Sequence, residues 1–176
     1  MTRKPASKKM KDAVKPLRII SDNGDLFIVQ QGDRRIAIGL IARGGKTAGK
    51  VGYFFRIEFY DNAPDKTALT LEPEQAIWIG KFGDLHILRG KWPLVGKLKD
   101  FTREAWPMPV FARHSETFNT NHICTYDEND VSKGLETWPS DQVPSYIDTS
   151  FVVEDGMAGA GYVEDYLMKI LGLRTQ

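Results

Sequence analysis

Short apolar runs separated by turn residues fill most of the chain from Leu17 onward, and this spacing is typical of successive strands rather than of long helices. The runs at 25–30 and 35–42 are rich in β-branched or aromatic residues, and the glycine in the turn at 31–33 suits a hairpin. A third run, at 51–60, alternates apolar and polar positions in its second half. We therefore predict a hairpin followed by a strand with one buried and one solvent-exposed face.

Later runs extend the predicted β structure. Residues 72–76 are suited to open a short helix before a strand at 77–79. Residues 86–95 combine a strand pattern with a glycine turn, and two prolines bracket an extended segment at 110–114. Most of the region 17–126 is thus predicted to be β structure.

The clearest helical pattern comes last, at about residues 162–171. It follows a glycine-rich segment at 155–161, which we expect to be flexible, and Gly172 provides a C-terminal stop. Its apolar stripe, spaced i, i+3, i+4, i+7 and i+8, consists of Val163, Tyr166, Leu167, Ile170 and Leu171. The opposite face is predicted to hold Glu164, Asp165 and Lys169. The predicted fold class is α+β and mostly β, a small, strongly bent antiparallel sheet or partial barrel with the C-terminal helix packed on it.

A single β-rich domain is predicted for residues 17–176, preceded by a flexible basic N-terminal arm at 1–16. A chain of 176 residues with 41% apolar residues can bury one core without disulfides. No apolar stretch approaches the roughly 18 residues of a membrane span, so no membrane partner is predicted. The lone Cys124 and the absence of a secretory-signal pattern favour a reducing, cytoplasmic compartment.

The net charge of +1 is the sum of two oppositely charged ends. Residues 1–18 carry seven Lys or Arg against Asp12, whereas residues 115–176 carry eleven Asp or Glu against three Lys or Arg. An acidic surface in folded sequence favours a basic partner, because complementary potentials accelerate association. An acidic face that is merely solvated is an equally compatible interpretation.

Sequence patterns for phosphate binding and for acid–base or calcium chemistry are incomplete. Gly44–Thr47 resembles part of a phosphate-binding loop, but Leu40 stands where the motif needs its first glycine. The strand pattern that follows supplies no helix N-terminus for an anion, so a hairpin loop is the better interpretation. The acidic turn around Asp127 shows neither a catalytic carboxylate pattern nor the full ligand pattern of a calcium loop.

A zinc site is a further interpretation. His122 and Cys124 stand two apart in an apparent strand, and His114 on a neighbouring strand would complete three ligands. No paired Cys or His spacing accompanies them in the sequence, and nothing around Cys124 resembles a nucleophile elbow. We predict no metal, no cofactor and no catalytic residue.

Four stretches carry a recognisable series of motifs. Residues 23–29 contain a Gly-Asp pair before an apolar run, and residues 36–43 form an apolar run around a glycine. Residues 88–96 read Leu-Arg-Gly-Lys-Trp-Pro-Leu-Val-Gly, and a proline-rich stretch follows at 106–111. These motifs resemble those of the immunity protein 26 family of bacterial polymorphic toxin systems, and the likeness covers about residues 20–130. The motif positions, to which we assign structural roles, are Gly24, Asp25, Gly39, Gly90, Trp92, Pro93 and Gly96.

The resemblance implies a mostly β domain that neutralises a cognate toxin in the producing cell by direct stoichiometric binding, with no catalysis. We expect the toxin-binding surface on acidic and aromatic loops rather than on the motif itself. The residues of that kind are Tyr126, Asp127, Glu128, Asp130, Glu136 and Trp138. The predicted partner is a basic toxin domain.

Two other function classes stay open at this point. The basic arm and the apparent exposure of Tyr53, Phe54 and Phe55 favour a nucleic-acid-associated β-barrel binding module as the alternative, although a nucleic-acid partner is not our expectation. Such a module requires a basic, aromatic, concave face, whereas an immunity protein requires an acidic one. An enzyme would require a pocket with convergent polar groups, which the sequence does not reveal.

Overall fold

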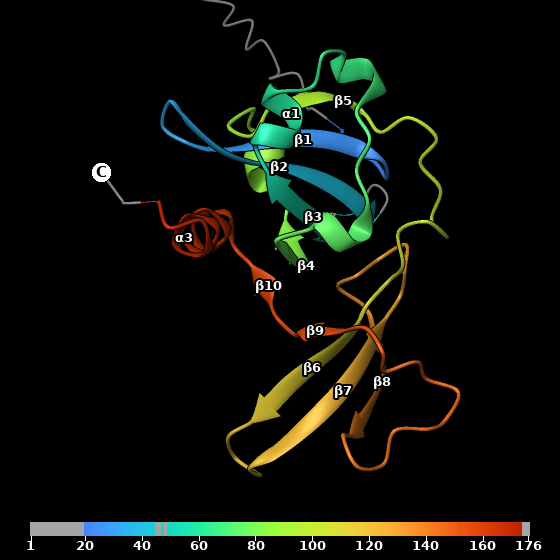
Figure 1. Ribbon diagram of the computed structural model, residues 1–176. Coiled ribbons are helices and arrows are strands. Elements are labelled where there is room, and N and C mark those ends of the chain that lie inside the picture. Colours follow the sequence, from blue (N-terminus) through green and yellow to red (C-terminus); the bar gives the residue numbers. More distant parts are fainter. Residues whose placement is uncertain (1–19, 45–46, 48, 174–176) are drawn as a thin grey trace, which may run out of the picture.

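Two β-sheets form the framework of the described chain (Figure 1). The computed structural model describes residues 20–44, 47 and 49–173, so the predicted arm at 1–16 lies outside the described residues. The strands are β1 (Asp25–Gln31), β2 (Arg34–Arg43), β3 (Gly49–Arg56), β4 (Trp78–Gly83), β5 (Leu94–Lys97), β6 (Val110–Ser115), β7 (Thr120–Tyr126), β8 (Gly134–Pro139), β9 (Val152–Glu154) and β10 (Met157–Ala158). The helices are α1 (Glu58–Asp61), α2 (Leu85–Leu88) and α3 (Ala160–Ile170), with short 3-10 helices at Lys66–Ala68 and Pro73–Gln75. The predicted α+β, mostly β fold class is confirmed.

The larger sheet has six strands in the order β10-β4-β3-β2-β1-β5. Its first hairpin is confirmed, with Leu26 of β1 opposite Leu40 of β2 and Gly32 at φ 58° in the connecting turn. Neighbouring strands are antiparallel except β10, which pairs in parallel with β4. The short helix predicted before β4 is the 3-10 turn at Pro73–Gln75.

Both faces of the six-stranded sheet are covered, so the predicted solvent-exposed face of the third strand is wrong. β3 is buried from Gly49 through Phe55. On one face α3 contributes Val163 and Leu167 to a cluster that includes Phe27 and Phe54. The other face is covered by residues from the segments that follow β3 and β5, namely Leu69, Leu71, Leu98 and Trp106. An alternating polar pattern predicts exposure only when no later segment returns over that face.

Short helices replace parts of two predicted strand segments. The end of the run at 51–60 forms α1, and the segment 86–95 begins within α2 before β5 starts at Leu94. Apolar runs of four to eight residues do not distinguish a strand from a buried helical turn. The C-terminal helix is confirmed as α3, and Gly172 follows it at φ 66°.

The buried face of α3 is rotated relative to the predicted apolar stripe, because Glu164 and Met168 are buried whereas Ile170, predicted to be on the stripe, is 39% exposed. Glu164 was placed on the solvent face, yet it is only 8% exposed and its Oε1 accepts a hydrogen bond from the indole N–H of Trp92 at 3.0 Å. The segment before the helix, expected to be flexible, contains β10, whose Met157 and Ala158 pair with β4. This pairing fixes the start of the helix against the edge of the sheet.

The smaller sheet has four strands in the order β8-β7-β6-β9 and projects away from the larger one (Figure 1). One of its faces packs Phe111, Cys124 and Val131 against Val51 of β3. The described strands therefore form two sheets joined by a small core, and they do not close into a barrel. The segment from β9 to β10 contributes a strand to each sheet, because β9 pairs with β6 of the smaller sheet and β10 pairs with β4 of the larger one.

Candidate partner-binding site

Acidic charge is concentrated in the four-stranded sheet. Residues 110–154, which span β6 to β9, contain eight Asp or Glu against Arg113 and Lys133, a net charge of −6. The whole chain carries +1, so this region differs in sign from the remainder. Eight of the eleven acidic residues in the predicted region 115–176 therefore lie in this sheet and its connections, whereas Asp155, Glu164 and Asp165 lie after β9 or in α3.

The strand register defines what we call the outer face of this sheet, opposite its packed face. The row at its centre consists of Ala112, Ile123 and Trp138, which are direct partners across β6, β7 and β8. Beside this row Thr125 pairs with Glu136. Because side chains alternate along a strand, these residues point away from Phe111 and Cys124. The outer face thus combines one large aromatic side chain with a carboxylate.

Tyr126 faces the packed side, where it joins a buried polar cluster. Its hydroxyl donates to the Asp155 carboxylate, whose oxygens lie 2.9 and 2.8 Å away. The Nζ of Lys81 lies 2.6 Å from Asp155 Oδ1 and 3.2 Å from the centre of the Tyr126 ring. Burial, followed by the hydrogen bond to Asp155, raises the pKa of Tyr126. Tyr126 therefore connects β7 to β4 and has its polar atom occupied within the molecule.

Asp127 and Asp130 shape the turn between β7 and β8. Asp127 Oδ1 accepts the backbone N–H groups of Asn129 at 2.8 Å and Asp130 at 3.3 Å. These hydrogen bonds hold the pKa of Asp127 below its usual range, with the bond from Asn129 the largest cause. Asp130 Oδ1 accepts from the backbone N–H of Ser132 at 3.2 Å. Both carboxylates are thus used to hold the turn that carries them.

Glu128 balances a buried guanidinium. Its Oε2 lies 2.9 Å from Nε of Arg43 and 3.6 Å from an N–H group of Arg103. Arg43 is almost fully buried and also donates to the carbonyl oxygens of Ala42 and Trp106. Glu128 itself is exposed. Its first role is therefore to pair an interior charge, which leaves only part of the carboxylate for a partner.

Glu136 and Trp138 differ from the other four predicted residues. Both belong to β8, the edge strand of the small sheet, and both lie on the outer face. Glu136 is exposed and Trp138 is partly buried. Of the six predicted residues, these two have the placement expected of a contact surface.

The three candidate zinc ligands do not converge. His122 and Cys124 share the packed face, but His114 pairs with Asn121 and so lies on the outer face. The ring of His114 is hydrogen-bonded through Nδ1 to Asn121 Oδ1 at 2.9 Å. Among the described residues, no group of three or more His, Cys, Asp or Glu side chains is arranged to hold a metal ion.

The motif glycines lie in or beside the six-stranded sheet. Gly24, Gly90 and Gly96 have φ values of 86°, 69° and 150°, a region that L-residues rarely adopt. Gly39 has an ordinary backbone but lies under the ring of Phe27, where an added Cβ would be 2.2 Å from Cζ. Each position therefore constrains the local backbone or packing.

The other motif residues also make interior contacts. Trp92 is fully buried and stacks on Phe27, with ring centres 5.7 Å apart. The carbonyl oxygen of Pro93 accepts the N–H of Ile28 at 3.0 Å. Asp25 accepts the backbone N–H of Asp22 at 2.7 Å, and burial raises the pKa of Asp25. The motif thus marks the packing of β1, β2 and β5.

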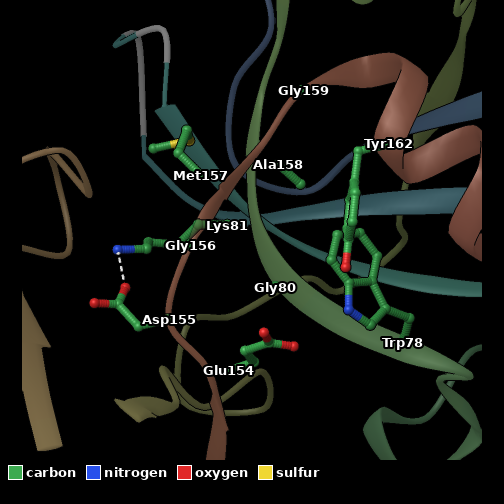
Figure 2. A pocket seen from close by; sticks show the side chains of 10 residues that line it. All are labelled: Trp78, Gly80, Lys81, Glu154, Asp155, Gly156, Met157, Ala158, Gly159 and Tyr162. Carbon is green, nitrogen blue, oxygen red and sulfur yellow. Dashed lines mark ion pairs between the residues drawn. The ribbon is translucent and has the colours of Figure 1, made fainter. Parts of the chain in front are cut away.

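A pocket of about 350 Å³ opens beside β4, and sequence reasoning did not identify it. Figure 2 shows the Lys81–Asp155 ion pair on one side of this pocket and the aromatic side chains of Trp78 and Tyr162 on the other. Glu154 also contributes to the wall. These residues come from two distant segments, 78–81 and 154–162, so no local spacing in the sequence brings them together.

Comparisons with known proteins agree with the motif positions. The family described as immunity protein 26 matches residues 22–121, more than half of the chain. No curated protein and no solved structure matches the chain. Within the described residues, none of the helices has both the length and the apolar character to cross a bilayer. On the extent of the family match, this chain belongs to the immunity protein 26 family.

Proposed function

We propose that this immunity protein neutralises its cognate toxin by direct stoichiometric binding, without catalysis, in the cytoplasm of the bacterium that makes the toxin. Family membership supports an immunity function, and one structural observation supports the mode of action. The four-stranded sheet concentrates a net charge of −6 between residues 110 and 154 and projects from the rest of the molecule (Figure 1).

The partner chemistry that fits this sheet is a basic toxin domain. Complementary potentials raise the encounter rate and disfavour wrongly charged partners. Several carboxylates of the region stay exposed, at the β6–β7 hairpin, on β8 and in the segment after β8: Glu116, Glu136 and Asp141. Their charge is available for attraction at a distance, whereas Asp127 and Asp130 are bonded within their turn.

The edge position of β8 adds a backbone contact to this surface. β8 is the last strand of the small sheet, and its residues from Gly134 through Thr137 are exposed. An exposed edge presents unpaired N–H and C=O groups that can pair with a strand of another protein. Trp138 follows directly on the same strand and supplies the large side chain typical of an interface anchor.

The nucleic-acid alternative loses the observation that motivated it. Tyr53, Phe54 and Phe55 are fully buried in β3, so the prediction that they are exposed is wrong. The projecting sheet is acidic, which repels a phosphate backbone. We therefore do not propose a nucleic-acid-binding function.

The proposal is tested by binding kinetics with the toxin encoded beside this gene. The variant Glu116→Gln, Glu136→Gln, Asp141→Asn removes exposed charge from the small sheet without touching the bonded turn. At about 0.01 M salt, where the Debye length is roughly 30 Å, association should slow about five- to tenfold. At about 1 M salt, where the Debye length is roughly 3 Å, the association rate should differ from wild type by less than about twofold.

A matched control removes the same charge from the larger sheet. The variant Asp33→Asn, Glu58→Gln, Glu74→Gln alters exposed residues in a turn and two short helices around that sheet, and it should associate at the wild-type rate at both salt concentrations. Trp138→Ala should instead raise the dissociation rate by about tenfold or more, as for an interface anchor. Equal slowing by both charge variants, or by neither, would show that the small sheet does not bind the toxin.

A further inference from the structure

The pocket beside β4 arises from the way one segment crosses between the two sheets. β10 pairs with β4 only at Lys81 and Phe82, while β9 pairs with β6 of the smaller sheet. Between these pairings the chain leaves the edge of β4. On that side, Trp78 and Gly80 have no strand partner among the described residues. The pocket of about 350 Å³ lies beside this part of β4 and is lined there by Trp78, Gly80 and Lys81.

Aromatic side chains form one wall. Trp78 and Tyr162 both contact Tyr166 of α3, with ring centres 5.7 and 5.8 Å apart, and Tyr162 stacks on it nearly parallel. Trp78 is also held by Phe54 at 4.7 Å. Tyr162 is 55% exposed, so this wall is both fixed by the core and open to solvent (Figure 2).

The charge of the pocket is negative. Lys81 and Asp155 form a buried ion pair at 2.6 Å, to which Tyr126 donates its hydroxyl, so their charges cancel. Glu154 is exposed and lines the same pocket, where Figure 2 shows its carboxylate between Asp155 and Trp78 in the view. The net charge of the lining residues is therefore −1, next to aromatic faces.

We propose that this pocket binds an arginine side chain of the partner. The inference rests on the proposed binding function and specifies the chemistry of one contact. A guanidinium stacks on aromatic faces and donates to a carboxylate in a planar fork, which matches Trp78, Tyr162 and Glu154. A volume of about 350 Å³ lies within the range of roughly 300–1,000 Å³ found for small-ligand sites.

The first test uses the full chain and a small probe. N-acetyl-arginine methylamide is titrated into the protein while the indole N–H of Trp78 and the amide of Gly80 are followed by NMR. We expect a saturable shift in the millimolar range, at least fivefold weaker binding in Glu154→Gln and Tyr162→Ala, and unchanged binding in Glu116→Gln. The norleucine analogue, which is apolar and uncharged, should give no saturable shift. No saturable shift with arginine, or equal shifts with norleucine, would overturn the assignment.

The second test separates the pocket from the proposed function. If the toxin binds wild type and Glu154→Gln with equal affinity, the pocket does not take a toxin arginine, although the immunity mechanism stands. If the toxin does not bind wild type at all, the proposed function fails, and the arginine titration alone decides the chemistry of the pocket. A tenfold loss of toxin affinity in each of Glu154→Gln and Tyr162→Ala, with circular dichroism unchanged, supports the proposed function and the arginine site together.

Discussion

Replacement of Gly39 by alanine should destabilise the protein strongly, although it adds a single methyl group. Gly39 lies in the middle of β2, directly under the ring of Phe27. An added Cβ would be 2.2, 2.5 and 2.7 Å from three ring carbons, whereas ordinary contacts begin at 3.4 Å. The ring must therefore move by more than 1 Å.

The surroundings of Phe27 prevent that movement. Its ring is packed between Phe54, Phe82 and Trp92, with ring centres 5.8, 5.4 and 5.7 Å away, and all four side chains are fully buried. Overpacking a tight core typically costs about 1–3 kcal/mol. Because every neighbour is itself confined, we expect the upper end, about 3 kcal/mol, which for a chain of this size corresponds to a fall in Tm of roughly 6–12 °C.

Thermal and urea unfolding followed by circular dichroism measure this effect. Gly83→Ala is the matched control, because no atom lies within 4 Å of its added Cβ. Its Tm should stay within about 2 °C of wild type. Phe27→Leu combined with Gly39→Ala should lose less stability than the sum of the single changes, since the smaller side chain relieves the contact. A Gly39→Ala protein that melts with wild type would refute the packing at this site.

Two further predictions concern polar groups in the interior. The hydroxyl of Tyr53 donates to the carbonyl oxygen of Pro107 at 2.6 Å, and burial raises the pKa of Tyr53. The stabilisation by this hydroxyl is therefore complete below the unfolded-state pKa of about 10 and is lost progressively as the pH rises from there through the raised folded-state pKa. Tyr53→Phe should cost about 1 kcal/mol near pH 7, and its difference from wild type in urea unfolding should narrow above pH 10 or so; a constant difference would contradict this assignment. Asp155→Asn should destabilise by about 3 kcal/mol because it leaves Lys81 buried without its countercharge. Asp148→Asn on the surface should leave the free energy of unfolding close to wild type, and equal effects of the two substitutions would show that the ion pair is not needed.

Local patterns predicted the elements whose partners are close in sequence. The hairpin from β1 to β2 has adjacent β-branched runs and a glycine turn, and α3 has an apolar stripe that ends at a glycine. In both cases the residues that form the pattern lie within about 20 residues of one another in the sequence. These elements accordingly appear where the sequence places them.

Features that depend on distant segments were not predictable in the same way. The burial of both faces of β3 requires α3 on one side and Trp106 on the other. The parallel pairings of β9 and β10 join strands separated by long stretches of chain, and no periodicity identifies them. A charged residue such as Glu164 is expected to face solvent, and its burial depends on the hydrogen bond from the indole of Trp92, which is distant in the sequence.

The candidate site was predictable as a region but not as a set of free side chains. Charge counting located the acidic region, because composition needs no tertiary information. It could not distinguish Glu136, which lies exposed on an edge strand, from Glu128, which pairs with the buried Arg43. Carboxylates near a turn have two competing uses, hydrogen bonding within the fold and attraction of a partner, and only the contacts separate them.

The connection between the two sheets bears on how the acidic surface can bind tightly. The segment 152–158 is a strand in both sheets, through β9 and β10, and Asp155 in its middle is bonded to Lys81 of the larger sheet and Tyr126 of the smaller one. Separating the sheets would break these hydrogen bonds and leave buried charges unpaired, which is costly. The small sheet is therefore held in one orientation before its partner arrives. Because a preorganised surface loses less conformational entropy on association, the same contacts give a slower dissociating complex, as the proposed stoichiometric binding of a toxin requires.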